Sequence, residues 1–256
     1  MFPIRDENPT ELTPVVTVAF ILANVAVWIY VQGAGMNEAQ LVQSVCAFGV
    51  IPAEVTGQTG AAAGVQLGPG AVCAFGGLTR SAALTSMFLH GSWLHLLGNM
   101  WFLWLFGNNV EDSMGHGRYL VFYLLVGLAA TAAHIWFNPD SPVPTVGASG
   151  AISGVMGAYL LLYPRVRVDT LFVLFVFVRI IPIPAWFVLL EWFVLQFLAS
   201  AMEPATTGGG VAYGAHIGGF VAGAVLIPFF RNAILVRAKR RHVKLRPTDV
   251  PHRGWW

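Results

Sequence analysis

Residues 147–163 read GASGAISGVMGAYLLLY, and this stretch decides the fold of the chain. It contains no charged residue, and as a helix it would be about 25 Å long at roughly 1.5 Å per residue. That length approaches the hydrocarbon core of a bilayer, which is about 30 Å thick. We therefore predict a membrane-spanning helix here, with Ser149 close to its start.

Small residues in this stretch predict which helix it packs against. Gly150, Gly154 and Ala158 recur every four residues, so one side of the predicted helix carries only small side chains. Gly219 and Gly223 repeat the spacing later in the chain. Such columns let the backbones of two membrane helices approach closely, so we predict that these two helices are in contact.

The composition extends the membrane prediction to the whole chain. Of 256 residues, 56% are hydrophobic and only 10% are charged, which is too few charges for the surface of a soluble protein of this size. The apolar stretches of span length or nearly so are roughly 14–32, 87–106, 119–137, 147–163, 184–202 and 210–230. We predict an all-α, polytopic membrane protein with six transmembrane helices. The run Leu171–Val178 is too short to span and is predicted to be re-entrant or interfacial.

The Lys and Arg residues predict the orientation, because short cytoplasmic loops collect them. The segment 231–256 contains eight, whereas the long loop of about 33–79 contains none and only Arg80 follows it. We predict that the tails 1–13 and 231–256 are cytoplasmic, that the loop is external and that 14–230 is one membrane domain. The basic tail is predicted to rest on anionic lipid. Nothing in the sequence predicts a nucleic-acid partner.

Cys46 and Cys73 are the only cysteines, and both fall in the predicted external loop. An oxidising compartment permits a disulfide between them. Two cysteines without a known distance cannot establish one, so the sequence leaves the disulfide open. The pair alone lacks the further ligands that a metal site needs, and no metal site is predicted.

Three predicted spans run from outside to inside, and all three contain unusual polar residues. At roughly 1.5 Å per residue, Ser149 lies about 8 Å and His216 about 9 Å below the outer face. His95 and Asn99 are four residues apart on one side of the second span, at about 12 and 18 Å counted from Met87. Buried polar atoms need partners or water, so we predict a shared polar pocket that opens outward.

Such a pocket would contain the groups that acyl transfer needs: an activated hydroxyl, a base within reach and donors for the oxyanion. A zinc protease would carry His-Glu-x-x-His, which is absent from the sequence. An aspartyl protease would need two aspartates within spans. Every aspartate instead lies in a predicted tail or loop: Asp6, Asp112, Asp140, Asp169 and Asp249. Serine chemistry is the remaining prediction.

Three motifs together resemble those of the rhomboid intramembrane serine proteases. They are His90-x4-His95-x3-Asn99, Gly147-Ala148-Ser149-Gly150 and Ala215-His216-x-Gly218-Gly219-x3-Gly223. The resemblance covers about residues 14–230 and implies a catalytic Ser149–His216 dyad in a six-helix bundle. It also implies an oxyanion hole formed by Asn99, His95 and the backbone N–H of Ser149. His90, Gly147 and Gly150 match positions that support the site.

The resemblance further implies what the protein would act on and where. Rhomboid proteases cleave transmembrane segments of other membrane proteins near the outer face, so the expected partners are such substrates and membrane lipid. Neither a metal nor an organic cofactor is implied. By analogy with the family, the expected location is a bacterial plasma membrane.

Two positions depart from the family pattern. Many rhomboid proteases have an aromatic residue one helical turn after the nucleophile, stacked on the catalytic imidazole, and here that residue is Ser153. The family also often has Trp-Arg in its first loop, where this chain reads Arg80-Ser81-Ala82. The first departure concerns the packing of His216 and the second the anchoring of the long loop. Neither removes a reacting group.

Two functions of other classes compete with proteolysis. A non-catalytic membrane binder or chaperone could use the same scaffold, although such a protein would be expected to have lost the serine or the histidine. A small-solute transporter would predict broken helices and an internal repeat, and no repeat is visible. The other polar and aromatic residues of the spans are interpreted as structural or interfacial: His134, Glu191, Trp93, Trp101, Trp104, Trp186 and Trp192.

Overall fold

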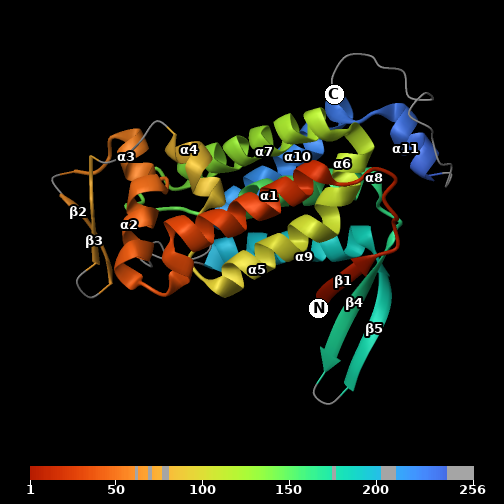
Figure 1. Ribbon diagram of the computed structural model, residues 1–256, viewed down its shortest axis with the longest axis horizontal. Coiled ribbons are helices and arrows are strands. Elements are labelled where there is room, and N and C mark those ends of the chain that lie inside the picture. Colours follow the sequence, from red (N-terminus) through yellow and green to blue (C-terminus); the bar gives the residue numbers. More distant parts are fainter. Residues whose placement is uncertain (61–62, 69–70, 77–80, 175–176, 203–211, 241–256) are drawn as a thin grey trace.

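A computed structural model of the chain describes residues 1–60, 63–68, 71–76, 81–174, 177–202 and 212–240. The basic tail is therefore described only as far as Arg240, and Arg80 lies outside the described residues. Figure 1 shows the long helices side by side in an elongated bundle.

Within the described residues, a helical segment occupies each of the six predicted ranges. These segments are α1 with η1 (Val15–Ala26, Val27–Val31), α5 with η4 and α6 (Trp93–Phe102, Leu103–Gly107, Asn108–Met114), α7 (His116–Phe137), α8 (Ser149–Leu162), α9 (Ala185–Met202) and α10 (Tyr213–Phe230). By length and composition α7 and α10 could each cross a membrane, while α1 with η1, α8 and most of α9 are shorter apolar helices. The remaining described helices are η2 (Gly33–Gly35), α2 (Glu38–Phe48), α3 (Pro52–Thr56), α4 (Ala82–Thr85), η3 (Ser86–Phe88) and α11 (Ala233–Arg240).

The prediction of an all-α fold is confirmed in part: the described residues are mostly helical, but they also form two small antiparallel sheets. One has the order β1–β4–β5 (Phe2–Asp6, Arg167–Leu174, Phe177–Pro184), and the other pairs β2 with β3 (Gly64–Gly68, Ala71–Ala74). The run predicted to be re-entrant or interfacial falls mostly within β4 and β5. Its Val and Phe side chains favour extended backbone. Its pairing with β1 joins segments far apart in the sequence, which no local pattern can predict.

The second long helix begins later than predicted. α5 starts at Trp93, and the side chain of Ser92 accepts a hydrogen bond from the backbone N–H of His95 at 3.1 Å, which caps the helix. His90 therefore precedes the helix instead of lying in it. At about 1.5 Å per residue, His95 and Asn99 lie about 3 and 9 Å along α5 from its first residue.

The contact predicted between the two helices with small-residue columns is confirmed. α8 is buried along most of its length, and α10 packs directly against it. A Cβ on Gly219 would collide with the carbonyl oxygen of Gly150, and one on Gly223 would collide with that of Gly154. The glycines thus let the two backbones touch.

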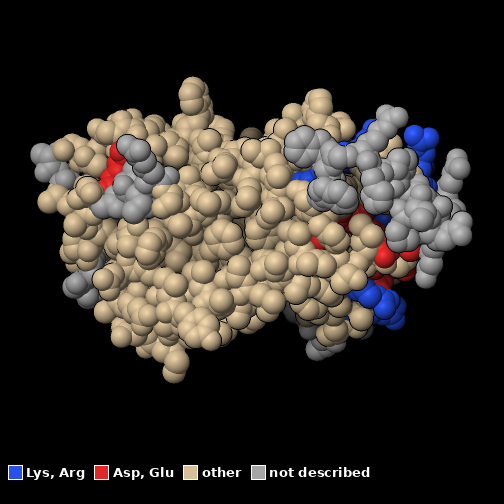
Figure 2. All heavy atoms as spheres, turned by 45° about the horizontal axis from the view of Figure 1, so that its top comes forward, with Lys and Arg blue, Asp and Glu red and all other residues tan. Residues whose placement is uncertain are grey.

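The two ends of the bundle differ in charge. We call the end with α2, α3 and the β2–β3 hairpin the loop end, and the end with the N-terminus, the β1–β4–β5 sheet and α11 the tail end (Figure 1). In Figure 2 the charged residues gather mainly over the tail end, and most of the remaining visible surface carries none. Glu111 and Asp112 of α6 are buried at the tail end, so the prediction that Asp112 lies in a loop is wrong.

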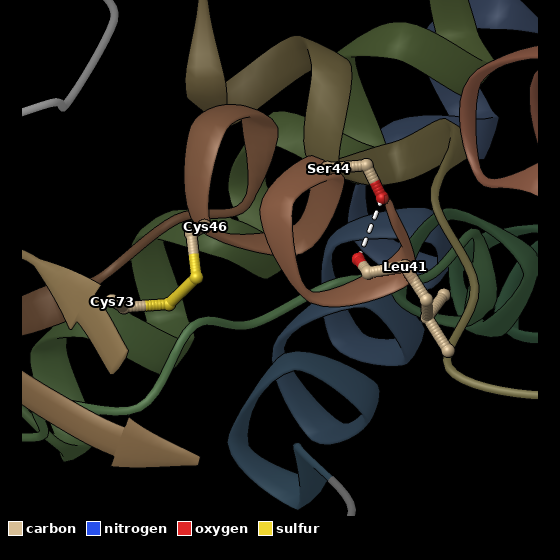
Figure 3. The surroundings of a disulfide bond; sticks show 4 residues. All are labelled: Leu41, Ser44, Cys46 and Cys73. Atoms are coloured by element: carbon tan, nitrogen blue, oxygen red, sulfur yellow. Dashed lines mark hydrogen bonds between the residues drawn. A yellow bond between two sulfur atoms is a disulfide. The ribbon is translucent and has the colours of Figure 1, made fainter. Parts of the chain in front are cut away.

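A disulfide fixes part of the loop end. Figure 3 shows Cys46 of α2 bonded to Cys73 of β3, with their Cα atoms 5.3 Å apart. Close by, the hydroxyl of Ser44 donates a hydrogen bond of 2.7 Å to the carbonyl of Leu41 within α2. The disulfide that the sequence left open therefore forms, and it ties the β2–β3 hairpin to α2.

Candidate active site

Ser149 and His216 meet at the loop end of the two touching helices. Ser149 is the first residue of α8, as predicted, and His216 lies in the first turn of α10. The Nε2 of His216 is 2.7 Å from the Oγ of Ser149. Only 7% of the surface of His216 is exposed, whereas Ser149 is partly exposed. The pair is thus a sheltered base in hydrogen-bond contact with an accessible hydroxyl.

Gly147 leaves a space beside the serine. Its backbone has a φ of 132°, which favours glycine, and its N–H donates a hydrogen bond to the carbonyl of Ser86 at 2.9 Å. A Cβ at this position would lie 2.9 Å from the Nε2 of His95 and 3.5 Å from the Oγ of Ser149. Any other residue would therefore fill the gap between the histidine ring and the hydroxyl.

Two side chains of α5 offer donors for this region. The backbone N–H of Gly91 approaches the Nδ1 of His95 at 3.4 Å. A neutral imidazole that accepts a hydrogen bond at Nδ1 carries its proton on Nε2, so the ring presents a donor toward the space beside Ser149. Asn99 lies one turn further along α5, and only 7% of its surface is exposed. Its Nδ2 has no hydrogen-bond partner among the described residues. A buried donor without a partner is costly, and such donors are often kept for function.

His90 holds the segment before α5 in place. Its backbone N–H donates to the Oε1 of Gln32 at 2.8 Å, and the Nε2 of Gln32 donates to the carbonyl of His90 at 2.7 Å. The buried ring of His90 packs edge-on against that of His95, with centroids 5.1 Å apart and planes at 69°. The contact fixes one side of His95. The role of Gln32 had no local signal in the sequence.

Two residues of α9 contact His216, and sequence reasoning missed both contacts. The Nδ1 of His216 lies 2.7 Å from the Oε1 of Gln196. The indole of Trp192 lies against the imidazole, with centroids 5.7 Å apart and planes at 36°. Ser153, where many family members have an aromatic residue, instead donates a hydrogen bond of 2.6 Å to the carbonyl of Ser149. The sequence did contain one sign of this arrangement. Because position 153 is not aromatic, a side chain from another element has to pack on the imidazole of His216.

His134, the polar residue near the outer end of the third predicted span, has a hydrogen-bond partner close by. The Nε2 of His134 lies 2.9 Å from the Oγ1 of Thr145. Among the described residues, no group of three or more His, Cys, Asp or Glu side chains is arranged to hold a metal ion.

These features define a helical protein with a paired serine and histidine between apolar helices, near a buried amide of Asn99 that has no partner among the described residues. The Rhomboid domain family matches residues 78–233, which is more than half of the chain. The chain therefore belongs to the rhomboid family.

Curated relatives agree with the family match. The chain is 29% identical to Rhomboid protein 1, mitochondrial, of Saccharomyces cerevisiae over 173 residues, which cover 64% of this chain and 45% of that protein. It is 44% identical to Rhomboid protease GluP of Bacillus subtilis over 77 residues, covering 30% and 15% of the two chains. It is 29% identical to Rhomboid-like protein 11, chloroplastic, of Arabidopsis thaliana over 154 residues, covering 56% and 50%. The chain thus matches half or less of the length of each of these relatives.

Family membership has three consequences. The chain is an integral membrane protein, and its mostly helical fold is that of a polytopic membrane protein. The family includes intramembrane serine proteases and also inactive members. Mitochondrial and chloroplastic relatives give no support to the predicted bacterial plasma membrane.

Proposed function

We propose that this chain is an intramembrane serine endopeptidase that cleaves transmembrane segments of other membrane proteins. The observation that carries the proposal is the 2.7 Å contact between the Nε2 of His216 and the Oγ of Ser149. A hydroxyl is a weak nucleophile until a neighbouring base accepts its proton, and this distance is within the range of a nucleophile–base hydrogen bond. Similarity to Rhomboid protease GluP supports the same function.

In the proposed first step, the Nε2 of His216 accepts the hydroxyl proton as the Oγ of Ser149 attacks a backbone carbonyl of the substrate. The substrate must be locally unwound, because the carbonyls of an intact helix are hydrogen-bonded and shielded. The partial exposure of Ser149 at the start of α8 supports an approach from the loop end.

The tetrahedral intermediate then carries a negative charge on the former carbonyl oxygen. We propose that Nε2–H of His95, Nδ2–H of Asn99 and the backbone N–H of Ser149 donate to this oxyanion. The first N–H groups of a helix have no partner within the helix, so Ser149 at the start of α8 supplies a free donor. Donors fixed before the reaction stabilise the developing charge without reorganisation.

The intermediate collapses when the imidazolium of His216 gives its proton to the leaving amine, which leaves an acyl group on Ser149. A water molecule, deprotonated by His216, attacks this ester and releases the second product. The residues in this proposal need no metal or organic cofactor. His90 and Gly147 act as supports, because they fix His95 and leave the space for the oxyanion. Gly150 is a support because it leaves room for Ala130 of α7.

We further propose that all six long helical segments span the membrane and that both tails are cytoplasmic. Under this topology 1–13 and 231–256 are tails, and 14–230 is the membrane domain. The charges at the tail end support this orientation, because Lys and Arg accumulate on the cytoplasmic side. A disulfide at the loop end supports an oxidising compartment on the opposite side. Cleavage would then occur near the outer face.

The proposal is tested with purified protein in detergent and a reporter that has a helix-destabilised transmembrane segment. Wild type, Ser149→Ala and the control Ser44→Ala are compared, since the hydroxyl of Ser44 donates its hydrogen bond to Leu41 within α2. We expect cleavage by wild type and by the control and none by Ser149→Ala. Equal cleavage by all three would refute the role of Ser149. A folded wild type that neither cleaves nor reacts with a fluorophosphonate would instead favour the non-catalytic binder.

A further inference from the structure

His216 has a second polar partner besides Ser149, and this partner completes its orientation. We propose that Gln196 of α9 is a positioning residue for His216, acting with Trp192; this inference rests on the proposed serine protease function. The Oε1 of Gln196 lies 2.7 Å from the Nδ1 of His216, on the side of the ring opposite to Ser149.

The amide oxygen decides which ring nitrogen carries the proton. A carboxamide oxygen can only accept hydrogen bonds, so the Nδ1 of His216 must donate and the neutral ring keeps its lone pair on Nε2. That lone pair is what receives the proton of Ser149. With the other tautomer, Nε2 would carry a proton and could not act as the base. Gln196 thus holds His216 in the reactive tautomer.

A glutamine suits this site better than the aspartate of a Ser-His-Asp triad. His216 is buried among apolar helices, where an ionised carboxylate would carry a large desolvation cost. The amide supplies the acceptor without a charge. It also stabilises the imidazolium that forms during the reaction, although less strongly than an ion would.

Trp192 acts from the same helix and on the same ring. It lies one turn before Gln196, so both residues point to one side of α9. Its indole packs on the imidazole, as the aromatic residue does at the position of Ser153 in many rhomboid proteases. In this chain α9 therefore fixes both the plane and the tautomer of His216.

Three variants separate positioning from packing. Gln196→Met keeps the length but removes the acceptor, and Gln196→Glu keeps an acceptor and adds a charge. Leu195→Met is the control on the adjacent, exposed position of α9. We expect Gln196→Met to lower kcat about 10- to 100-fold with KM within about twofold, because it loses a hydrogen bond to a ring that becomes charged in the reaction. Leu195→Met should match wild type.

The pH profile gives a readout that a purely structural role would not change. Gln196→Glu should restore most of the kcat lost in Gln196→Met and move the acid limb of the profile to higher pH, because a carboxylate stabilises the protonated imidazole. His95, His134 and Tyr213 also face His216 and are the same in every variant. An unchanged kcat in Gln196→Met, or a Gln196→Glu variant that restores none of the lost kcat, would overturn the inference.

The tautomer itself is measured without any cleavage. Imidazole ¹⁵N shifts, assigned to His216 by comparison with His216→Ala, should show a protonated Nδ1 in wild type and a mixture in Gln196→Met. If wild type shows this bias but no Ser149-dependent cleavage, the positioning role stands and the protease proposal fails. The same tautomer in both proteins would contradict positioning, whatever the activity.

A different observation carries a second inference, which concerns the β1–β4–β5 sheet. In the antiparallel register Val173 pairs with Val178 and Leu171 pairs with Ile180, so these four side chains share one face. Val173, Val178 and Ile180 are each about 60% exposed. Figure 1 shows the sheet projecting sideways from the tail end, across the long axis of the bundle. An exposed apolar sheet face of this kind indicates an interaction surface.

The apolar face continues into the membrane-facing side of the bundle. Phe2 of β1, paired with Leu171, stacks on Trp101 of α5 at 5.8 Å and 27°, and the Nε1 of Trp101 donates to the carbonyl of Pro3 at 2.8 Å. Trp104 and Trp186 lie in the adjoining segments η4 and α9 and are half exposed. Tryptophan side chains gather where acyl chains meet lipid headgroups. We infer that this sheet face binds lipid where acyl chains meet headgroups, in the membrane leaflet at the tail end of the bundle.

The unpaired edge of β5 also favours a position of the sheet at the membrane–water interface. β5 is an edge strand, and Pro182 and Pro184 remove two of its donors, which disfavours pairing with a strand of a second copy. An open edge cannot lie in the hydrocarbon core, so the sheet belongs at the headgroup level. Exposed Arg179 can reach anionic headgroups from there.

A single labelled cysteine tests this surface, because both native cysteines are in the disulfide. Val178→Cys carries an environment-sensitive NBD label in liposomes of phosphatidylcholine and phosphatidylglycerol, and Gln58→Cys, at an exposed position after α3 at the loop end, is the control. We expect brominated lipids to quench the label at 178 and not the label at 58. Quenching at 178 by aqueous iodide alone, or energy transfer between labelled copies without lipid quenching, would overturn the inference.

Discussion

The two ends of α8 bury polar groups in opposite ways. At the tail end, Tyr159 donates to Asp6 at 2.6 Å, and Lys239 lies 2.6 Å from Asp112 and 2.5 Å from the Oδ1 of Asn109. At the loop end, Ser149 is surrounded by neutral side chains, and the Nδ2 of Asn99 has no partner among the described residues. The tail end satisfies its charges and stabilises the fold, whereas the loop end leaves donors available for a substrate.

The difference teaches that burial alone does not mark the active site. Glu111 is fully buried, yet it accepts hydrogen bonds from the backbone N–H groups of Val16 and Thr17 at 2.9 and 2.8 Å and thereby caps α1. A buried charge with complete partners is structural. A serine held by a base next to unused donors suggests chemistry instead.

The largest expected effect is at the loop end, where Ser149→Ala and His216→Ala should each lower kcat at least about 10³-fold. The double variant should be no worse than either single variant, because the two side chains act as one unit. Cleavage of the transmembrane reporter under single-turnover conditions measures all three. Losses that multiply in the double variant would show that the residues act separately.

At the tail end, Lys239→Met should lower the free energy of unfolding by about 3 to 5 kcal/mol, because it leaves the buried carboxylate of Asp112 without its cation. Arg237→Met, at an exposed position of the same helix, should stay within about 0.5 kcal/mol of wild type. Unfolding in mixed micelles measures both. Specific activity of folded Lys239→Met should be normal, and a selective loss of kcat would contradict the separation of the two ends.

Asn99→Ala should remove one oxyanion donor and lower kcat about 10²- to 10³-fold, while the fold remains stable. Asn138→Ala is the matched control, since the amide of Asn138 donates to the backbone carbonyl of His134 and not toward the site. Kinetics of reporter cleavage separate the two variants. An unchanged rate in Asn99→Ala would exclude Asn99 from the oxyanion hole.

The smallest expected effect is a dependence of stability on pH at the tail end. Burial raises the pKa of Asp6 to about 6, so the folded protein holds this proton more tightly than the unfolded chain, where the pKa is near 3.8. The stability that this group contributes is therefore full below pH about 4 and is lost as the pH rises through about 6. In Asp6→Asn that slope should disappear, as measured by thermal unfolding between pH 4 and 7. An identical slope in both proteins would contradict the assignment.

Several features of the fold and site could be predicted from the sequence. Long apolar runs located the six helical segments, and the columns of Gly150 and Gly219 predicted the contact between α8 and α10. That contact is what brings Ser149 to His216, so the central pair followed from local patterns. The arrangement of His95 and Asn99 on one side of α5 followed from their spacing.

Other features depend on long-range packing and had no local signal. The second half of β4, Leu171–Leu174, has apolar residues on both faces, so the period-2 alternation that marks a strand is absent there. Ser92 was not recognised as a helix cap, because the apolar pattern continues on both sides of it. Gln196 and Trp192 reach His216 only through the rotation of α9 about its axis, which one sequence does not determine.

The most direct test of the central claim is covalent labelling of Ser149. Purified wild type and His216→Ala are treated with a fluorophosphonate, and the modified residue is identified by mass spectrometry. We predict an adduct on Ser149 in wild type and at least a hundredfold slower labelling in His216→Ala, on the order expected when the base is lost. Absence of an adduct on folded wild type, or labelling that does not depend on His216, would contradict the Ser149–His216 dyad.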